Sequence, residues 1–76
     1  MFDQKLFSDR LLLLRKTNKI TTVDLAKAIG ISKQAISQFE KCSSYPHCRT
    51  LVALADYFAV SLDYLVGRSD DPKFHK

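Results

Sequence analysis

The chain has 76 residues, a formal net charge of +4 and a hydrophobic content of 46%. This length allows one domain, close to the size at which a single core is only marginally sufficient. With two glycines and two prolines, the composition indicates a folded, regular structure. No apolar run approaches the roughly 20 residues that span a bilayer, and the N-terminus lacks a signal-peptide pattern. We therefore expect a cytoplasmic protein that does not enter a membrane.

The basic residues are concentrated in the middle of the sequence. Residues 25–50 carry four basic side chains against one acid, Glu40, whereas the remaining residues sum to +1. A local excess of this kind suits an anionic partner.

The two cysteines, Cys42 and Cys48, are expected to stay reduced in a cytosol. A metal site recruiting His47 between them lacks a fourth ligand, so we expect no metal and no cofactor. The favoured interpretation of Cys48 is a small buried apolar residue. A thiol-based sensor using Cys42 remains an alternative.

The first predicted helix has an apolar stripe at i, i+4 and i+7 that faces a core: Phe7, Leu11 and Leu14. Three further leucines lie off that stripe, so either the buried face is broad or some of them contact a second subunit: Leu6, Leu12 and Leu13. A polar break follows at residues 17–19.

Two short helices are predicted next, separated by a glycine. Thr21 precedes an apolar run and can cap the first of them, with Asp24 three residues later as in a capping box. Gly30 suits the end of this helix and Ser32 the cap of the next. Because so few residues separate the helices, they are expected to cross steeply, with small Ala26 allowing close approach.

The segment ISKQAISQFEK, residues 31–41, predicts a helix with two different faces. Ile36 and Phe39, backed by Ile31 and Ala35, can turn inward. No carboxylate occurs from Ser32 to Gln38, although a helix that faces only water usually mixes acids with bases. The opposite face is polar: Lys33, Gln34, Ser37, Gln38 and Lys41.

The segment KCSSYPHC then predicts a polar loop interrupted by Pro46. A fourth helix is predicted from a new apolar stripe: Cys48, Leu51, Val52, Ala55 and Phe58. A shorter fifth helix, with Ser61 as its cap and Gly67 as its stop, carries three more apolar residues: Val60, Leu62 and Leu65.

Residues 22–41, TVDLAKAIGISKQAISQFEK, resemble the helix-turn-helix of the lambda-repressor-like family, the Cro/cI or Xre type. Ala26 stands at the small contact position and Gly30 in the turn. The apolar positions also match: Leu25, Ile29, Ile31, Ile36 and Phe39. The resemblance continues to LVALADYFAVSLDYLVG and covers residues 6–67. It implies an all-α, compact five-helix DNA-binding domain over residues 1–67, followed by a polar tail at 68–76.

A base-reading helix must fit a major groove about 12 Å wide and carry short polar side chains without acids. Gln can bond adenine at two atoms, Lys can reach guanine, and Ser can serve either. The resemblance thus implies a recognition helix at about 32–40, with these base-reading candidates: Ser32, Lys33, Gln34, Ser37 and Gln38.

Phosphate contacts in the family come from the start of the first motif helix and from the loop after the recognition helix. The matching residues here are Thr22, Lys41, Ser43, Ser44, Tyr45 and His47. The sequence departs from the family pattern at three positions. Thr22 replaces a common Gln, Cys42 a frequent Gly, and His47 a frequent capping Ser.

Glu40 is an acid beside the expected DNA surface. The family often pairs this Glu with an Arg of the first helix, and Arg15 occupies the matching position. We therefore expect a structural ion pair between Arg15 and Glu40, which the planar guanidinium suits.

The sequence contains no recognisable catalytic arrangement and no Gly-rich phosphate loop, so no enzymatic activity is expected. The leading hypothesis is a sequence-specific double-stranded DNA-binding regulator, expected to be a repressor. It would bind a near-palindromic operator as a homodimer, with Tyr64, Val66 and Phe74 near the contact between subunits. The alternative is an antitoxin-like or adaptor module of the same fold whose partner is a protein.

Overall fold

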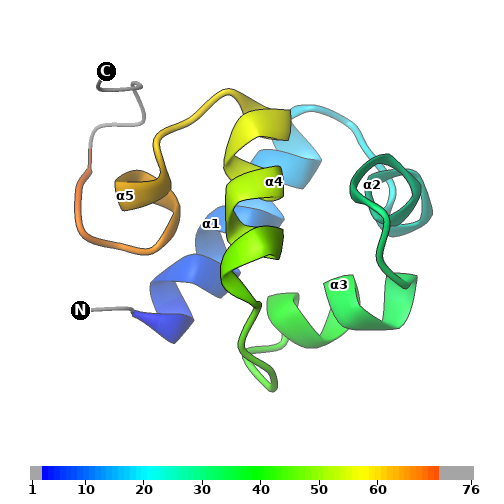
Figure 1. Cartoon of the computed structure of the whole chain (residues 1–76), viewed down its shortest axis with the longest axis horizontal. Helices are drawn as coiled ribbons and strands as arrows, with labels where there is room; N and C mark the ends of the chain where they lie inside the picture. Colours follow the sequence, from blue (N-terminus) through cyan, green and yellow to red (C-terminus); the bar gives the residue numbers. More distant parts are fainter. Residues whose placement is uncertain (1–2, 71–76) are drawn as a thin grey trace.

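The computed structural model describes residues 3–70 and contains five α-helices and no strand within them (Figure 1). The helices are α1 (Gln4–Thr17), α2 (Thr22–Ile29), α3 (Lys33–Glu40), α4 (Cys48–Phe58) and α5 (Leu62–Leu65). This confirms the all-α, five-helix class. The prediction for Phe74 lies outside the described residues.

The predicted starts and stops of the helices are confirmed where short polar residues flank apolar runs. Thr21, Ser32 and Ser61 each accept a hydrogen bond from the backbone N–H three residues later, at 3.0–3.1 Å. Gly30 ends α2 in the left-handed conformation, with φ of 78°. The sequence thus sets the short spacing between α2 and α3.

The helices α2 and α3 pack against each other and cross steeply, as their short connection predicts. In Figure 1, α2 is seen end-on while α3 lies across the view. Ala26 is buried, so its small side chain lets the two backbones approach. The crossing leaves the outer side of α3 free of neighbouring helices over Ser32, Lys33 and Gln34, which are all exposed.

The core is built from one face of each helix. Phe7 and Leu11 are fully buried and Leu14 packs against them from a half-buried position. Leu6 and Leu12 are also half-buried, but Leu13 is 56% exposed, so the broad buried face does not extend to it. The buried cluster draws on all five helices: Phe7, Leu11, Leu25, Ala26, Ile36, Phe39, Leu54, Ala55 and Leu65.

The predicted stripe of α4 is confirmed at Leu51, Ala55 and Phe58 and is wrong at Cys48 and Val52. Cys48 is exposed rather than buried, and Val52 is 43% exposed. The inward residues follow i, i+3, i+4 and i+7 spacing from a later start: Leu51, Leu54, Ala55 and Phe58. The five residues LVALA are all apolar, so hydrophobicity alone does not choose between the two registers. Leu62 of α5 is likewise 37% exposed, whereas Val60 and Leu65 are buried.

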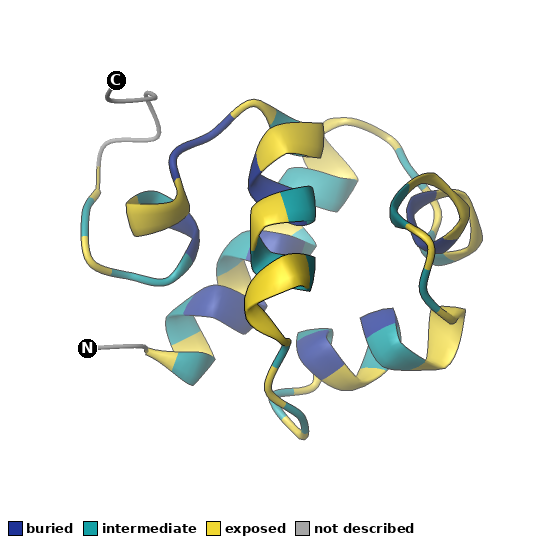
Figure 2. Cartoon of the chain, viewed as in Figure 1, coloured by how far each residue is buried: buried dark blue, intermediate teal, exposed yellow. Residues whose placement is uncertain are grey.

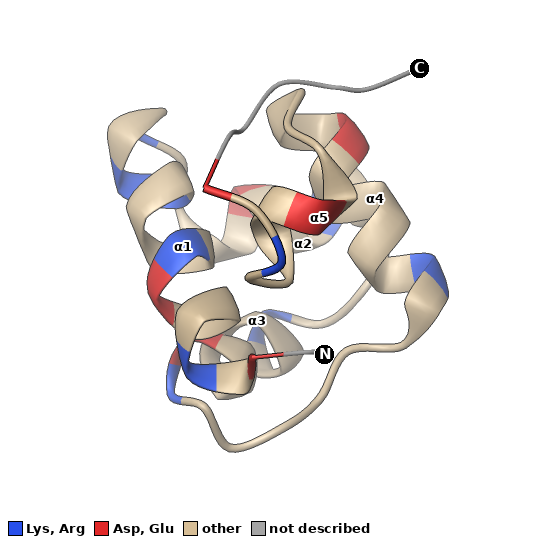
Figure 3. Ribbon diagram, turned by 90° about the vertical axis from the view of Figure 1, so that its left-hand side faces the viewer, with Lys and Arg blue, Asp and Glu red and all other residues tan. Residues whose placement is uncertain are grey.

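Arg10 of α1 connects this helix to α5 and to the residues just after it, up to Asp70. Its guanidinium lies over the ring of Tyr64, 4.1 Å from the centroid, and donates to the Tyr64 carbonyl. It also donates to the Ser69 carbonyl at 2.7 Å and to the Asp70 carboxylate at 2.8 Å. Figure 3 shows acidic residues on α5 and just beyond it.

Candidate nucleic-acid interface

The polar residues predicted on α3 fall on one side of the helix, from its N-cap Ser32 to Gln38. Ser32, Lys33, Gln34 and Gln38 are exposed, and Ser37 is half-buried (Figure 2). The Ser32 hydroxyl oxygen accepts the Ala35 N–H at 3.1 Å, which leaves its own proton available to an acceptor. This set, the α3 polar face, presents an ammonium, two amides and two hydroxyls without a carboxylate.

The opposite side of α3 holds that face rigidly on the core. Ile36 is fully buried and Phe39 is 6% exposed. The rings of Phe39 and Phe7 meet edge to face, with centroids 6.0 Å apart and planes at 64°. Because the two apolar residues fix the rotation of α3 about its axis, they also fix the direction in which Gln34 and Gln38 project.

The ion pair expected between Arg15 and Glu40 is present. Arg15 Nε and Nη2 donate to the two carboxylate oxygens of Glu40 at 2.6 and 3.1 Å. This two-pronged contact balances the only acid between Leu25 and Thr50. A free carboxylate at the end of α3 would repel a polyanion, and here its charge is matched within the protein.

The chain leaves α3 through residues 41–44, the α3 exit turn. Cys42 adopts the left-handed conformation, with φ of 61°, in the position where the resemblance predicts glycine. Its N–H donates to the Phe39 carbonyl at 3.2 Å, and the Ser43 N–H donates to the Gln38 carbonyl at 3.0 Å. These bonds form a Schellman cap, so the turn closes normally despite the missing glycine. Lys41 is exposed on this turn.

Two polar residues of α1, Gln4 and Ser8, contact this region, and no motif in the sequence marks them. Gln4 Nε2 lies 3.3 Å from the carbonyl oxygens of both Cys42 and Ser44. Ser8, which is buried, donates its hydroxyl to the Phe39 carbonyl. No sequence signal marks these contacts, because they join positions 31 to 40 residues apart. The i, i+4 spacing of Gln4 and Ser8 shows only that they share a face of α1.

The remaining phosphate candidates lie around the loop and the helix starts. Tyr45 and His47 are exposed, and Ser43 is exposed with its hydroxyl donating to the Gln38 carbonyl at 3.1 Å. Ser44 and Thr22, the first residue of α2, are half-buried. The structure therefore brings together the five candidates of residues 41–47, while Thr22 belongs to a separate helix start.

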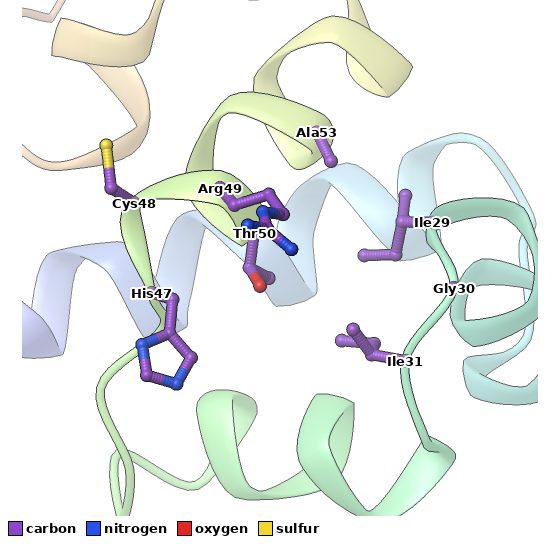
Figure 4. Close-up of a pocket in the computed structure, with 8 residues that line it drawn as sticks. All are labelled: Ile29, Gly30, Ile31, His47, Cys48, Arg49, Thr50 and Ala53. Carbon is purple, nitrogen blue, oxygen red and sulfur yellow. The ribbon is translucent and has the colours of Figure 1, made fainter.

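An open groove of about 610 Å³ separates the α2–α3 turn from the start of α4 (Figure 4). Ile29 and Ile31 point from the turn toward α4, where Arg49 and Thr50 lie opposite them. His47 occupies the N-cap position of α4 but makes no capping hydrogen bond with its side chain. Arg49, one of the four basic side chains of residues 25–50, lines this groove.

Neither a metal cluster nor a membrane span is found in the described part of the chain. Among residues 3–70, no group of three or more His, Cys, Asp or Glu side chains lies close enough to hold a metal ion. None of the five described helices is long and apolar enough to cross a bilayer.

Known proteins share both the sequence and the fold. The family described as helix-turn-helix matches residues 11–65. The HTH-type transcriptional regulator YobD of Bacillus subtilis is 42% identical over 67 residues, covering 88% of this chain and 60% of YobD. The repressor protein C2 of Salmonella phage P22 is 37% identical over 62 residues, covering 82% of this chain and 29% of C2.

A crystal structure of the P22 c2 repressor in complex with a synthetic operator superposes with a TM-score of 0.80 at 36% identity. The match covers 84% of this chain and 97% of that chain. The chain belongs to the helix-turn-helix family of transcriptional regulators, of the Cro/cI or Xre type. It spans about 60% of the length of YobD.

Proposed function

We propose that this chain is a transcriptional regulator that binds double-stranded DNA in a sequence-specific manner, with α3 in the major groove. We expect it to act as a repressor in the cytoplasm and to catalyse no reaction. The P22 relatives, a protein named a repressor and a structure holding a synthetic operator, support this assignment by similarity. The domain would comprise residues 1–67, with residues 68–76 as a polar tail.

The observation that carries the proposal is the α3 polar face. Four of its five members are exposed, it contains no acid, and Ile36 and Phe39 anchor its opposite side in the core. The amides of Gln34 and Gln38 suit adenine edges, and the Lys33 ammonium suits a guanine edge. A protein-binding surface would be expected to include apolar or acidic residues here, and the sequence from Ser32 to Gln38 has no acid among its exposed positions.

The phosphate contacts would come from both sides of this face. Lys41 on the α3 exit turn, together with Tyr45 and His47, can approach the phosphates of one strand with an ammonium and polar hydrogens. Ser43 would join them by exchanging its hydroxyl bond to the Gln38 carbonyl for one to a phosphate. Thr22 at the start of α2 can meet the backbone elsewhere, assisted by the N-terminal N–H groups of that helix. Such contacts position the protein without reading sequence.

Selection from a random duplex pool, followed by sequencing, tests this function directly. We expect enrichment of one short motif, and binding to that motif at least a thousandfold tighter than to random duplex, as is typical of specific regulators. A pool that shows no enriched motif, with equal affinity for all duplexes, would contradict sequence-specific recognition. Retention of a protein partner without any duplex binding would favour the adaptor alternative.

We further propose that the protein binds DNA as a homodimer on a near-palindromic site. One short helix reads only a few base pairs, and two copies about one helical turn apart supply the specificity that a genome requires. Tyr64 and Val66 are half-buried and therefore available in part to a second subunit, although the Tyr64 ring already contacts Arg10. Sedimentation of the complex should give two protein chains per duplex. Protection of a single half-site by one chain would overturn the dimer.

A further inference from the structure

We infer that Gln4 is a positioning residue for DNA binding, because its amide holds the α3 exit turn in the shape that meets the phosphates. The inference rests on the proposed function and adds to it a residue of α1 that contacts no DNA itself. Gln4 is the first residue of α1 and is half-buried. Its Nε2 donates to the carbonyl oxygens of Cys42 and Ser44, both at 3.3 Å.

The two carbonyls belong to the second and fourth residues of the α3 exit turn and flank Ser43. The Schellman bonds of Cys42 and Ser43 fix the beginning of the turn, and Ser8 adds a bond to the Phe39 carbonyl. Beyond Ser43, the Gln4 amide is the contact that ties the Ser44 carbonyl to the body of the protein. One side chain thus joins the turn to α1 on both sides of Ser43.

This tether affects binding through conformational entropy. Ordering the backbone of a free residue costs conformational entropy, and a loop that is ordered before binding does not incur this cost on the DNA. Lys41 and Ser43, which we propose as phosphate contacts, lie on the tethered segment. The effect of the tether should therefore be the same on every duplex, because phosphate contacts carry no sequence information.

The variant Gln4→Met tests the inference, since it keeps the length of the side chain and removes the donor. We expect binding to the selected duplex and to random duplex to weaken by the same factor, about 3- to 10-fold, as for one net hydrogen bond. The slope of log affinity against log salt should stay unchanged, because the phosphate contacts still form in the complex. Lys41→Ala, which removes such a contact, should instead make that slope shallower by about one unit.

A matched control is Asn18→Leu at the other end of α1. Asn18 Nδ2 also donates to a backbone carbonyl, that of Leu14, at 2.7 Å, and it does not contact the α3 exit turn. Amide hydrogen exchange in the free protein supplies a readout that does not depend on DNA. Exchange of the Ser43 amide, which is hydrogen-bonded to the Gln38 carbonyl, should accelerate in Gln4→Met and stay at the wild-type rate in Asn18→Leu.

The outcomes separate the inference from the proposed function. If the wild-type protein binds no duplex, the proposed function and the role of Gln4 fall together. If the wild type binds and Gln4→Met matches it in affinity and in exchange of the Ser43 amide, only the inference is overturned. A loss confined to the selected duplex would also overturn it, because that pattern belongs to base reading.

Discussion

Arg15, near the end of α1, joins Glu40, the last residue of α3, to the connection between α1 and α2. Besides its two bonds to the Glu40 carboxylate, the guanidinium donates to the Ile20 carbonyl at 3.0 Å. The side chains of Arg15 and Glu40 are only 16% and 11% exposed. Screening by water is therefore limited, and the pair sets the position of α3 relative to α1.

Removing one partner of this pair should be more damaging than removing both. Arg15→Met leaves the Glu40 carboxylate half-buried without its cation, and Glu40→Leu leaves the Arg15 guanidinium without its carboxylate. Each should lower the free energy of unfolding by about 3 kcal/mol, and the double variant by less than either. Denaturant melts of the four proteins measure this coupling. Strictly additive losses would show that the two side chains do not act as a pair.

The exposed pair of Lys5 and Asp9 provides the control for that cycle. Its atoms are 3.6 Å apart and its side chains are 80% and 60% exposed. Because water screens such a pair, Lys5→Met should change the free energy of unfolding by no more than about 0.5 kcal/mol.

The two glycines should respond differently to alanine. Both have positive φ, but a Cβ on Gly30 would have no atom within 4 Å, whereas on Gly67 it would lie 3.0 Å from Asp3 Cβ and Leu6 Cδ2. Gly30→Ala should lower the free energy of unfolding by about 1 kcal/mol, from backbone strain alone. Gly67→Ala should lower the free energy of unfolding by about 1 kcal/mol more, because the start of α1 must move away from the added Cβ. Thermal melts of the two variants would contradict this account if the losses were equal.

The left-handed residues at helix ends predict stabilising changes to glycine. Lys19 follows the C-cap residue of α1, Asn18, with φ of 57°, and its side chain is exposed, so Lys19→Gly relieves strain and removes little packing. We expect a gain of about 0.5–1 kcal/mol in the free energy of unfolding. Cys42→Gly, with φ of 61°, should change stability in the same direction.

The control for these changes is Ala28→Gly, which places glycine inside α2. Ala28 is exposed and helical, so this variant should lower the free energy of unfolding by about 1 kcal/mol. A loss at Lys19 as large as that at Ala28 would show that the left-handed residue is not strained.

Much of this fold follows from local features of the sequence. Thr21, Ser32 and Ser61 are short polar residues just before apolar runs, and each caps the helix predicted for it. Gly30 marks the turn between α2 and α3 for the same local reason. Arg15 and Glu40 are different, since only the resemblance to the family relates two positions that lie 25 residues apart.

The rest depends on tertiary contacts that the sequence does not encode locally. In α4 the apolar run LVALA fits more than one register, and packing against the core selects Leu54 rather than Cys48 and Val52. Gln4 joins α1 to the turn after α3, and Arg10 joins α1 to the residues after α5, at sequence separations of 38 to 60 residues. A polar residue on an amphipathic helix gives no sign of such a partner.

The central claim is that the α3 polar face reads bases, and the binding of Gln34→Ala to the selected duplex and to random duplex tests it most directly. If Gln34 bonds a base edge, the variant should lose about 1–3 kcal/mol of binding free energy on the selected duplex and little on random duplex. It should also become less selective at one base position. If Gln34→Ala keeps both the affinity and the site preference of the wild type, α3 does not read sequence through this residue, and a protein partner becomes the better account.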